Sequence, residues 1–220
     1  MTDLPSVVCY GDSNTHGAIG TTGRRHPRDV RWPGVVAAAL AGRAVVIEEG
    51  LNGRTTIWDD PFAAGRNGRT YLLPCLASHA PVAVVVIMLG TNDLKAIYRL
   101  GAPDIAAGAR SLVNLARESA AGPEGRPPAV LLVAPPVLGP LTSASELWGF
   151  EAALETSRRL GPLYRESAAQ SGAAFLDAGT LVEADPADGV HLDADAHATL
   201  GRAIAAEVER LLVGAGSPAG

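Results

Sequence analysis

The sequence predicts a three-layer α/β fold, in which a sheet of five parallel strands lies between two layers of helices. Short apolar runs rich in β-branched residues recur along the chain, and segments of helical periodicity alternate with them. With 220 residues, of which 47% are hydrophobic, the chain is long enough to bury one sizeable core. No change of composition marks a domain boundary, so we expect residues 1–220 to form a single domain.

The predicted strands are the short apolar runs at residues 7–10, 45–47, 82–89, 130–133 and 174–176. Apolar positions spaced three or four apart predict helices at residues 32–40, 71–79, 104–119, 145–171 and 193–213. In the fourth of these helices, Gly161-Pro162 predicts a break. Residues 214–220 are rich in glycine and alanine and are expected to form a flexible tail.

The first strand leads directly into Gly11-Asp12-Ser13-Asn14, which offers a serine hydroxyl where a strand is expected to end. The glycine permits a sharp turn, and the polar residues after it can cap a short helix. Because functional sites in parallel sheets lie beyond the carboxyl ends of the strands, Ser13 is well placed for a nucleophile. Asp12 and Thr15 are expected to brace the turn by local hydrogen bonds. Taken alone, the same residues are typical of an ordinary turn.

Asp188 and His191, just before the last predicted helix, provide the groups that such a serine needs. A serine hydroxyl is a weak nucleophile unless an imidazole accepts its proton and a carboxylate orients that imidazole. Three positions apart on one loop, the two side chains can face each other. From this motif alone, a turn with a structural histidine remains the alternative.

Two loops that follow predicted strands offer donors for the oxyanion that forms when an ester carbonyl is attacked. In the first loop Gly53 can expose its backbone N–H and let a substrate approach closely. In the second, the carboxamide of Asn92 can point an N–H at the same oxygen. Each loop alone is also typical of a turn. Together, the four pieces predict a serine esterase that works through an acyl-enzyme.

These four blocks, in this order and across nearly the whole chain, resemble the SGNH hydrolase superfamily, also called the GDSL esterases. The resemblance implies a flavodoxin-like sheet with the strand order 2-1-3-4-5. It also implies that Ser13 is the nucleophile, His191 the general base and Asp188 the group that orients it. The implied oxyanion donors are the backbone N–H groups of Ser13 and Gly53 and the side chain of Asn92.

Further stretches narrow the resemblance to the mycobacterial arylesterase and acyltransferase group, at residues 29–32, 48–51, 54–56, 71–76 and 87–93. This implies hydrolysis of short-chain and aryl esters, acyl transfer to alcohols as well as to water, and assembly into oligomers. The chain departs from the group at Asn14, where the nucleophile block has leucine, and at His16 and Ala18, where the acyltransferase has bulky aromatic residues. A less enclosed and less apolar pocket favours water as the acyl acceptor.

The candidate substrate-binding residues are Asn14, His16, Trp58 and Val190. Trp148 and Phe150 are further candidates for a pocket wall, with plain core packing as the alternative. Lys95 lies near the predicted site and is expected to be solvated.

Other functions stay open at this point. A carbohydrate O-deacetylase of the same superfamily would use the same residues. A metal-dependent hydrolase would use the alternating string His191, Asp193, Asp195 and His197. Helix-favouring alanines and an N-cap at Asp193 instead predict that Asp195 and His197 face solvent. A non-enzymatic binding module would require all four blocks to be incidental. The serine mechanism needs neither a metal nor an organic cofactor.

The net charge of −5 and the scattered arginines give no basic footprint for nucleic acid, and the basic run at residues 23–28 is expected to be a solvated loop. The longest apolar run is too short to cross a bilayer. Cys9 and Cys75 are isolated in apolar sequence and predict buried free thiols, which fit a reducing compartment. We therefore expect a cytoplasmic protein that acts on a small-molecule ester, with water or an alcohol as acceptor, and a homo-oligomer is possible in principle.

Overall fold

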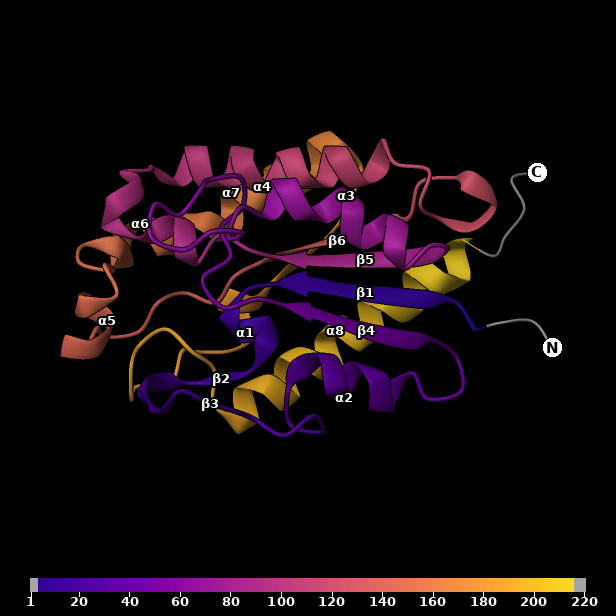
Figure 1. The fold of residues 1–220 in the computed structure, drawn as a ribbon. Coiled ribbons are helices and arrows are strands. Elements are labelled where there is room, and N and C mark those ends of the chain that lie inside the picture. The colour runs from indigo at the N-terminus through magenta and orange to yellow at the C-terminus, as the bar shows by residue number, and fades with distance from the viewer. Residues whose placement is uncertain (1–3, 216–220) are drawn as a thin grey trace.

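A five-stranded parallel sheet lies at the centre of the computed structural model, which describes residues 4–215 (Figure 1). Its strands are β1 (Ser6–Gly11), β4 (Val45–Gly50), β5 (Val82–Met88), β6 (Ala129–Ala134) and β7 (Ala174–Asp177). They lie in the order β4-β1-β5-β6-β7, and each neighbouring pair is parallel. Counted along the chain this order is 2-1-3-4-5, so the predicted α/β fold and sheet order are confirmed.

Helices cover both faces of this sheet (Figure 1). One face carries α3 (Gly68–Ser78), α4 (Ala102–Arg117) and α7 (Leu160–Ser171), and the other carries α2 (Trp32–Ala39) and α8 (Ala194–Ala215). Because both faces are covered, successive residues of a strand are buried in different cores. In β1, Val8 and Tyr10 pack with α3, α4 and α7, whereas Val7 and Cys9 pack with α2 and α8.

The prediction of one helix over residues 145–171 with a break at Gly161-Pro162 is wrong. The segment forms α5 (Ser143–Leu147), α6 (Ala153–Arg158) and α7, and its main interruption lies at residues 148–152 rather than at Gly161-Pro162. Ala152 has a left-handed backbone with φ of 60°, which a continuous right-handed helix cannot contain. Pro162 is tolerated because it lies in the first turn of α7, where its missing N–H has no helical partner.

A short hairpin that was not predicted lies between α1 (Ser13–His16) and α2. Its strands are β2 (Ala18–Ile19) and β3 (Arg24–Arg25), which pair in the antiparallel sense. The basic run expected as a loop therefore supplies one strand. Arg25, Arg28 and Arg31 each form an ion pair with Glu48, at 3.4, 3.0 and 2.8 Å respectively. These contacts tie the segment from the hairpin to α2 onto strand β4.

Helix α8 ends at Ala215, so it includes the first two residues of the predicted tail, and the rest of that tail lies outside the described residues. Short 3-10 helices occur at η1 (Gly20–Thr22), η2 (Asn92–Leu94), η3 (Ala96–Tyr98), η4 (Pro123–Gly125) and η5 (Ala178–Thr180). Within residues 4–215, no helix combines the length and the apolar character needed to cross a membrane.

The carboxyl ends of β1, β4 and β5 meet at the end of the sheet where α1 lies (Figure 1). From β1 the chain proceeds to β4 on one side, and β5 then pairs with β1 on the other side. Such a reversal of strand order opens a crevice beyond the strand ends. The loops that carry Ser13, Gly53 and Asn92 follow these three strands and therefore come together there.

Candidate active site

Ser13 begins α1, a single helical turn that follows β1 almost directly. Asp12 caps this turn, because its Oδ1 accepts the backbone N–H of Asn14 at 3.0 Å, as expected. Thr15 departs from the expectation, since its Oγ1 has no hydrogen-bond partner among the described residues. It lies against Gly11 so closely that a Cβ there would be 1.9 Å from Thr15 Oγ1. Tight packing, rather than a second hydrogen bond, completes the nucleophile turn.

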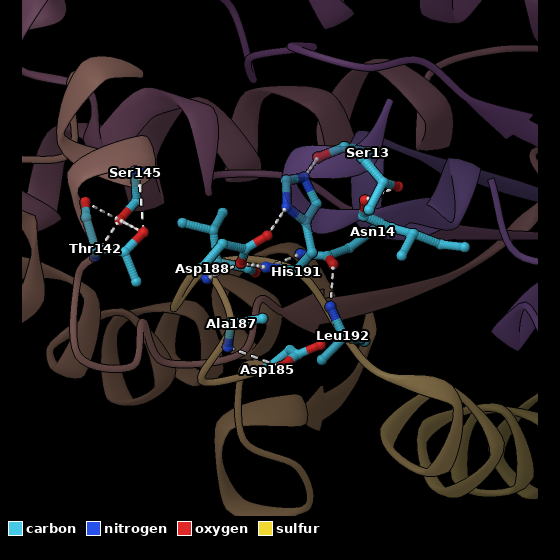
Figure 2. Close-up of polar contacts among 12 residues, drawn as sticks. Ser13, Asn14, Thr142, Ser145, Asp185, Ala187, Asp188, His191 and Leu192 are labelled. Carbon is cyan, nitrogen blue, oxygen red and sulfur yellow. Dashed lines mark hydrogen bonds and ion pairs between the residues drawn. The ribbon is translucent and has the colours of Figure 1, made fainter. Parts of the chain in front are cut away.

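His191 lies between Ser13 and Asp188 (Figure 2). Its Nε2 is 3.1 Å from the Oγ of Ser13, and its Nδ1 is 2.8 Å from the Oδ2 of Asp188. A carboxylate can only accept, so Nδ1 carries the hydrogen and Nε2 is free to accept a proton from Ser13. The second oxygen of Asp188 accepts the backbone N–H groups of Val190 and His191 at 2.7 and 2.8 Å.

Asp188 is ionised at neutral pH. Burial raises the pKa of its carboxyl, but the hydrogen bonds from the His191 ring and from the backbone of His191 and Val190 outweigh burial and lower the pKa below its usual value. The carboxylate is itself covered by Gly20, where an added Cβ would lie 2.7 Å from Asp188 Oδ2. Gly20 has φ of 36°, and its lack of a side chain permits this contact.

The side chain of Asn14 holds the loop that carries His191. Its Nδ2 donates to the C=O of Val190 at 3.2 Å, and its Oδ1 accepts the N–H of Leu192 at 3.0 Å (Figure 2). The two contacts lie on either side of His191 in sequence. The residue next to Ser13 therefore fixes the backbone on both sides of His191.

Three N–H groups are candidates for binding an oxyanion. Neither the backbone N–H of Ser13 nor that of Gly53 donates to another group among residues 4–215. The Nδ2 of Asn92 donates one hydrogen to the C=O of Arg54 at 3.1 Å, which leaves its second hydrogen available. Ser13, Gly53 and Asn92 line one pocket together with His191. An anionic oxygen in that pocket can be stabilised by these N–H groups.

Asp93 and Arg54 join the two oxyanion loops to each other and to the nucleophile turn. Asp93 is fully buried, and its carboxylate accepts the backbone N–H of Thr56 and the Thr56 hydroxyl. The buried guanidinium of Arg54 donates to the C=O of Gly11 at 2.9 Å and lies over the ring of Tyr10, 4.2 Å from its centroid. Sequence reasoning had given neither residue a role.

Two buried carboxyl groups lie under the site. Burial raises the pKa of Asp12 to about 6, against the hydrogen bond from Asn14 and the field of His191, which lower it. Burial likewise raises the pKa of Asp93 to about 7, against the hydrogen bonds from Thr56. Both groups therefore titrate near neutral pH, unlike the ionised Asp188.

The pocket over Ser13 has a volume of about 280 Å³. Of the four candidate substrate-binding residues, His16 and Val190 line it, whereas Asn14 and Trp58 do not. Asn14 instead turns to the backbone of the His191 loop, and Trp58 lies beyond the Gly53 loop. The other lining residues are Ala18, Gly20, Gly23, Arg24, Asn52, Lys95, Trp148 and Phe150.

Trp148 and Phe150, the further candidates for a pocket wall, both line the pocket, and Lys95 lines it with them. The ring of Trp148 meets the His191 ring edge to face, with centroids 5.5 Å apart. Lys95 is half-buried rather than solvated, and its Nζ lies 5.7 Å from the centroid of the Phe150 ring. The pocket thus combines aromatic surface with a cationic side chain.

The alternating string considered for a metal does not converge. His191 lies between Ser13 and Asp188, Asp193 accepts the N–H of Ala196 at 2.8 Å as a helix cap, and Asp195 is exposed. His197 does not face solvent as predicted. It is fully buried, and its Nδ1 accepts the N–H of Trp32 at 3.3 Å. Within residues 4–215, Glu49, Cys75 and His79 are the one trio close enough to share an ion.

Comparison with known proteins supports the arrangement. The model of the GDSL-like lipase/acylhydrolase family matches residues 9–199. The native aryl esterase of M. smegmatis is 40% identical, with a TM-score of 0.90 over 95% of this chain and 100% of that chain. A carbohydrate acetylesterase from Sinorhizobium meliloti is 41% identical, with a TM-score of 0.90 over 94% and 99%. No significant match is found among curated protein sequences.

The parallel α/β sheet, with a serine, a histidine and a carboxylate gathered at its carboxyl edge, defines a carboxylic ester hydrolase. The chain belongs to the GDSL-like lipase/acylhydrolase family and has esterase activity of the SGNH type. Its substrates are small-molecule esters, with water as the acceptor. The predicted family, fold and class of reaction are confirmed.

Proposed function

We propose that Ser13, His191 and Asp188 are the catalytic residues of this esterase. The observation that carries the proposal is the continuous chain of contacts from Ser13 Oγ through the His191 ring to Asp188. His191 Nε2 accepts the hydroxyl proton as Ser13 Oγ attacks the ester carbonyl, and the same proton then goes to the departing alcohol. His191 next takes a proton from water, which attacks the acyl-enzyme, releases the acid and restores Ser13.

The oxyanion formed in each step is assigned to the Ser13 and Gly53 N–H groups and the Asn92 side chain. Within residues 4–215 the Ser13 and Gly53 N–H groups donate to no other group, and Asn92 keeps one amide hydrogen beyond the one that it donates to Arg54, which supports this role. Loss of one such donor costs about 3–4 kcal/mol of transition-state stabilisation in a comparable serine hydrolase.

The favoured substrates are esters with a short acyl group, including aryl esters. A volume of about 280 Å³ lies at the lower end of the range for small-molecule pockets, which leaves little space for a long acyl chain. Trp148 supplies an aromatic face beside His191, and the name of the M. smegmatis relative, an aryl esterase, agrees with that surface. Water is the main acceptor because His16 and Ala18 leave the pocket open, and transfer to alcohols is a side reaction.

A second candidate is removal of acetyl groups from carbohydrates. Two observations favour it: the acetylesterase from Sinorhizobium meliloti is 41% identical over nearly the whole chain, and the pocket carries polar groups at Asn52, His16 and Arg24. The catalytic residues and the chemistry are the same in both cases. The leaving alcohol alone differs.

Two broader assignments accompany the activity. A single domain over residues 1–220 is supported by the family match to residues 9–199 and by the 95% of the chain that aligns with one solved structure. A cytoplasmic location is supported by Cys9 and Cys75, which are both free and buried. Oligomerisation is proposed from the family resemblance.

The test is hydrolysis of para-nitrophenyl acetate, butyrate and octanoate, with and without a chelator. We expect the wild type to prefer the shorter esters and to ignore the chelator. Ser13→Ala should lower kcat by about four to six orders of magnitude, because loss of a triad nucleophile leaves only binding and the oxyanion donors. Ser78→Ala, which removes an exposed hydroxyl on α3, is the matched control. Near-normal turnover by folded Ser13→Ala would refute the mechanism.

A further inference from the structure

The pocket has an unusual charge for a protein that is acidic as a whole. The net charge of the chain is −5, yet the two permanently charged side chains that line the pocket, Arg24 and Lys95, are both cationic. No aspartate or glutamate lines it. Neither Arg24 nor Lys95 forms an ion pair with another residue in the range 4–215.

The surroundings of Arg24 strengthen the positive charge. Arg25, Arg28 and Arg31 follow on the same segment, and they share a single carboxylate, Glu48. The exposed Asp29 is the other acidic residue of this segment, so positive charge remains in excess there. Burial lowers the pKa of His16, which lines the pocket, and the positive charges of Arg25 and Arg31 lower it further. The electrostatic field of this segment therefore reaches the pocket wall.

Lys95 lies on the loop after Asn92 and lines the same pocket as Arg24, and its ammonium is partly desolvated against Phe150. Burial lowers the pKa of Lys95, and the field of Asp60 only partly opposes this. The carboxylate of Asp60 already accepts the N–H groups of Phe62 and Ala63. The Lys95 ammonium can therefore pair with an anionic group of a bound molecule. Such a pair would offset the free-energy cost of burying the ammonium.

We propose that the natural ester carries a carboxylate on its alcohol half, and that Arg24 and Lys95 bind this carboxylate while Ser13 attacks the acyl carbon. The inference rests on the proposed function, because the reaction at Ser13 and the short acyl group are taken from it. The favoured acyl group, such as acetyl, has no second charged group, and a pocket of about 280 Å³ leaves little space for a longer one, so we assign the charge to the alcohol. A planar guanidinium can bind a carboxylate through two hydrogen bonds, and an ammonium adds a third.

Three acetate esters of similar size provide the test. They are para-acetoxybenzoate, the neutral para-acetoxybenzamide and the cationic para-acetoxyphenyltrimethylammonium. The readout is the charge preference, defined as kcat/KM for the benzoate divided by kcat/KM for the benzamide. We expect a preference of about tenfold or more in the wild type, and a cationic ester that is poorer than either.

Charge variants assign the preference to the two residues. Lys95→Gln and Arg24→Gln should each lower the charge preference by about three- to tenfold. Lys95→Arg keeps the positive charge and should therefore keep most of the charge preference. Arg202→Gln removes one positive charge from exposed α8, outside the pocket, and should leave the preference unchanged. Raising the salt from about 0.01 M to about 1 M shortens the screening length from about 30 Å to about 3 Å and should reduce the preference.

The outcomes separate this inference from the function on which it rests. A preference that is the same in the wild type and in the folded double variant Lys95→Gln/Arg24→Gln would overturn the carboxylate assignment. If the benzamide is still cleaved in a Ser13-dependent way in that case, the proposed function stands. Failure of the folded wild type to cleave any of the three esters would overturn both. Circular dichroism and thermal melting establish that each variant is folded.

Discussion

Replacing Asn14 by leucine tests whether the proton acceptor must be held by the residue next to the nucleophile. Asn14 is 1% exposed, and its carboxamide bonds to Val190 and Leu192 at 3.2 and 3.0 Å. Leucine has a similar volume and no polar atom. Asn14→Leu therefore deletes both hydrogen bonds without opening a large cavity.

The magnitude follows from these two contacts. Asn14→Leu leaves two buried backbone groups unpaired, and each costs about 1–3 kcal/mol, so the free energy of unfolding should fall by about 2–6 kcal/mol. The His191 loop also loses its restraint on both sides, and a displacement of about 1 Å can slow a reaction about 100-fold. We expect kcat to fall about 10- to 100-fold, with KM within about twofold because Asn14 does not line the pocket.

Two measurements, esterase kinetics and urea unfolding, separate positioning from general destabilisation. Ser157→Ala is the matched control, because the Ser157 hydroxyl is also buried and bonds to the backbone of Leu138 and Leu154, away from the pocket. The control should lose stability and keep kcat. The reasoning is refuted if folded Asn14→Leu retains kcat within about twofold of wild type, or if the control loses kcat to the same extent.

Three further predictions concern the surroundings of the site. Gly20→Ala places a Cβ 2.7 Å from Asp188 Oδ2 and should lower kcat about tenfold. Gly42 also has a positive φ, of 73°, but has open space around it, so Gly42→Ala should cost stability alone, and equal kinetics in the two variants would contradict this. Burial raises the pKa of Asp93 to about 7 in the folded protein, so between about pH 4 and about pH 7 the native state holds a proton that the unfolded state has lost. The free energy of unfolding should therefore fall as the pH rises through this window, by at most about 4 kcal/mol. Urea unfolding at both ends of this window should show a flatter dependence in Asp93→Asn, and an unchanged slope would assign the effect to other groups. Trp148→Ala should raise KM for phenyl acetate about two- to tenfold more than KM for ethyl acetate, because the aromatic contact is lost, and an equal change for both esters would contradict an aryl-binding role.

The convergence of Ser13, Gly53, Asn92 and His191 on one pocket could be predicted because the positions of these residues follow from the order of the strands. Ser13, Gly53 and Asn92 each come directly after a strand, and parallel strands that are neighbours in a sheet end at the same edge. The third-neighbour spacing of Asp188 and His191 let one loop supply both side chains. Local sequence was sufficient to place these residues close together; their catalytic roles are proposals.

Other features depend on contacts between distant segments and had no local signal. The Asn14 carboxamide meets Val190 and Leu192 more than 170 positions away, so it was read as a substrate contact. Gly20 has its role only because the hairpin covers Asp188. His197 is different, because a signal was present. His197 precedes the buried Leu200 by three positions on α8, and that spacing predicts the core-facing side of the helix.

The contact between Ser13 and His191 joins residues that are 178 positions apart in the sequence. In the proposed mechanism, the ribosome therefore makes the nucleophile 178 residues before the base that activates it. Ser13 stays an ordinary alcohol until the segment before α8 has emerged and folded against the sheet. A nascent or truncated chain that lacks this segment cannot attack esters in the cell. The recovery of esterase activity during refolding accordingly reports the step that brings Ser13 and His191 together.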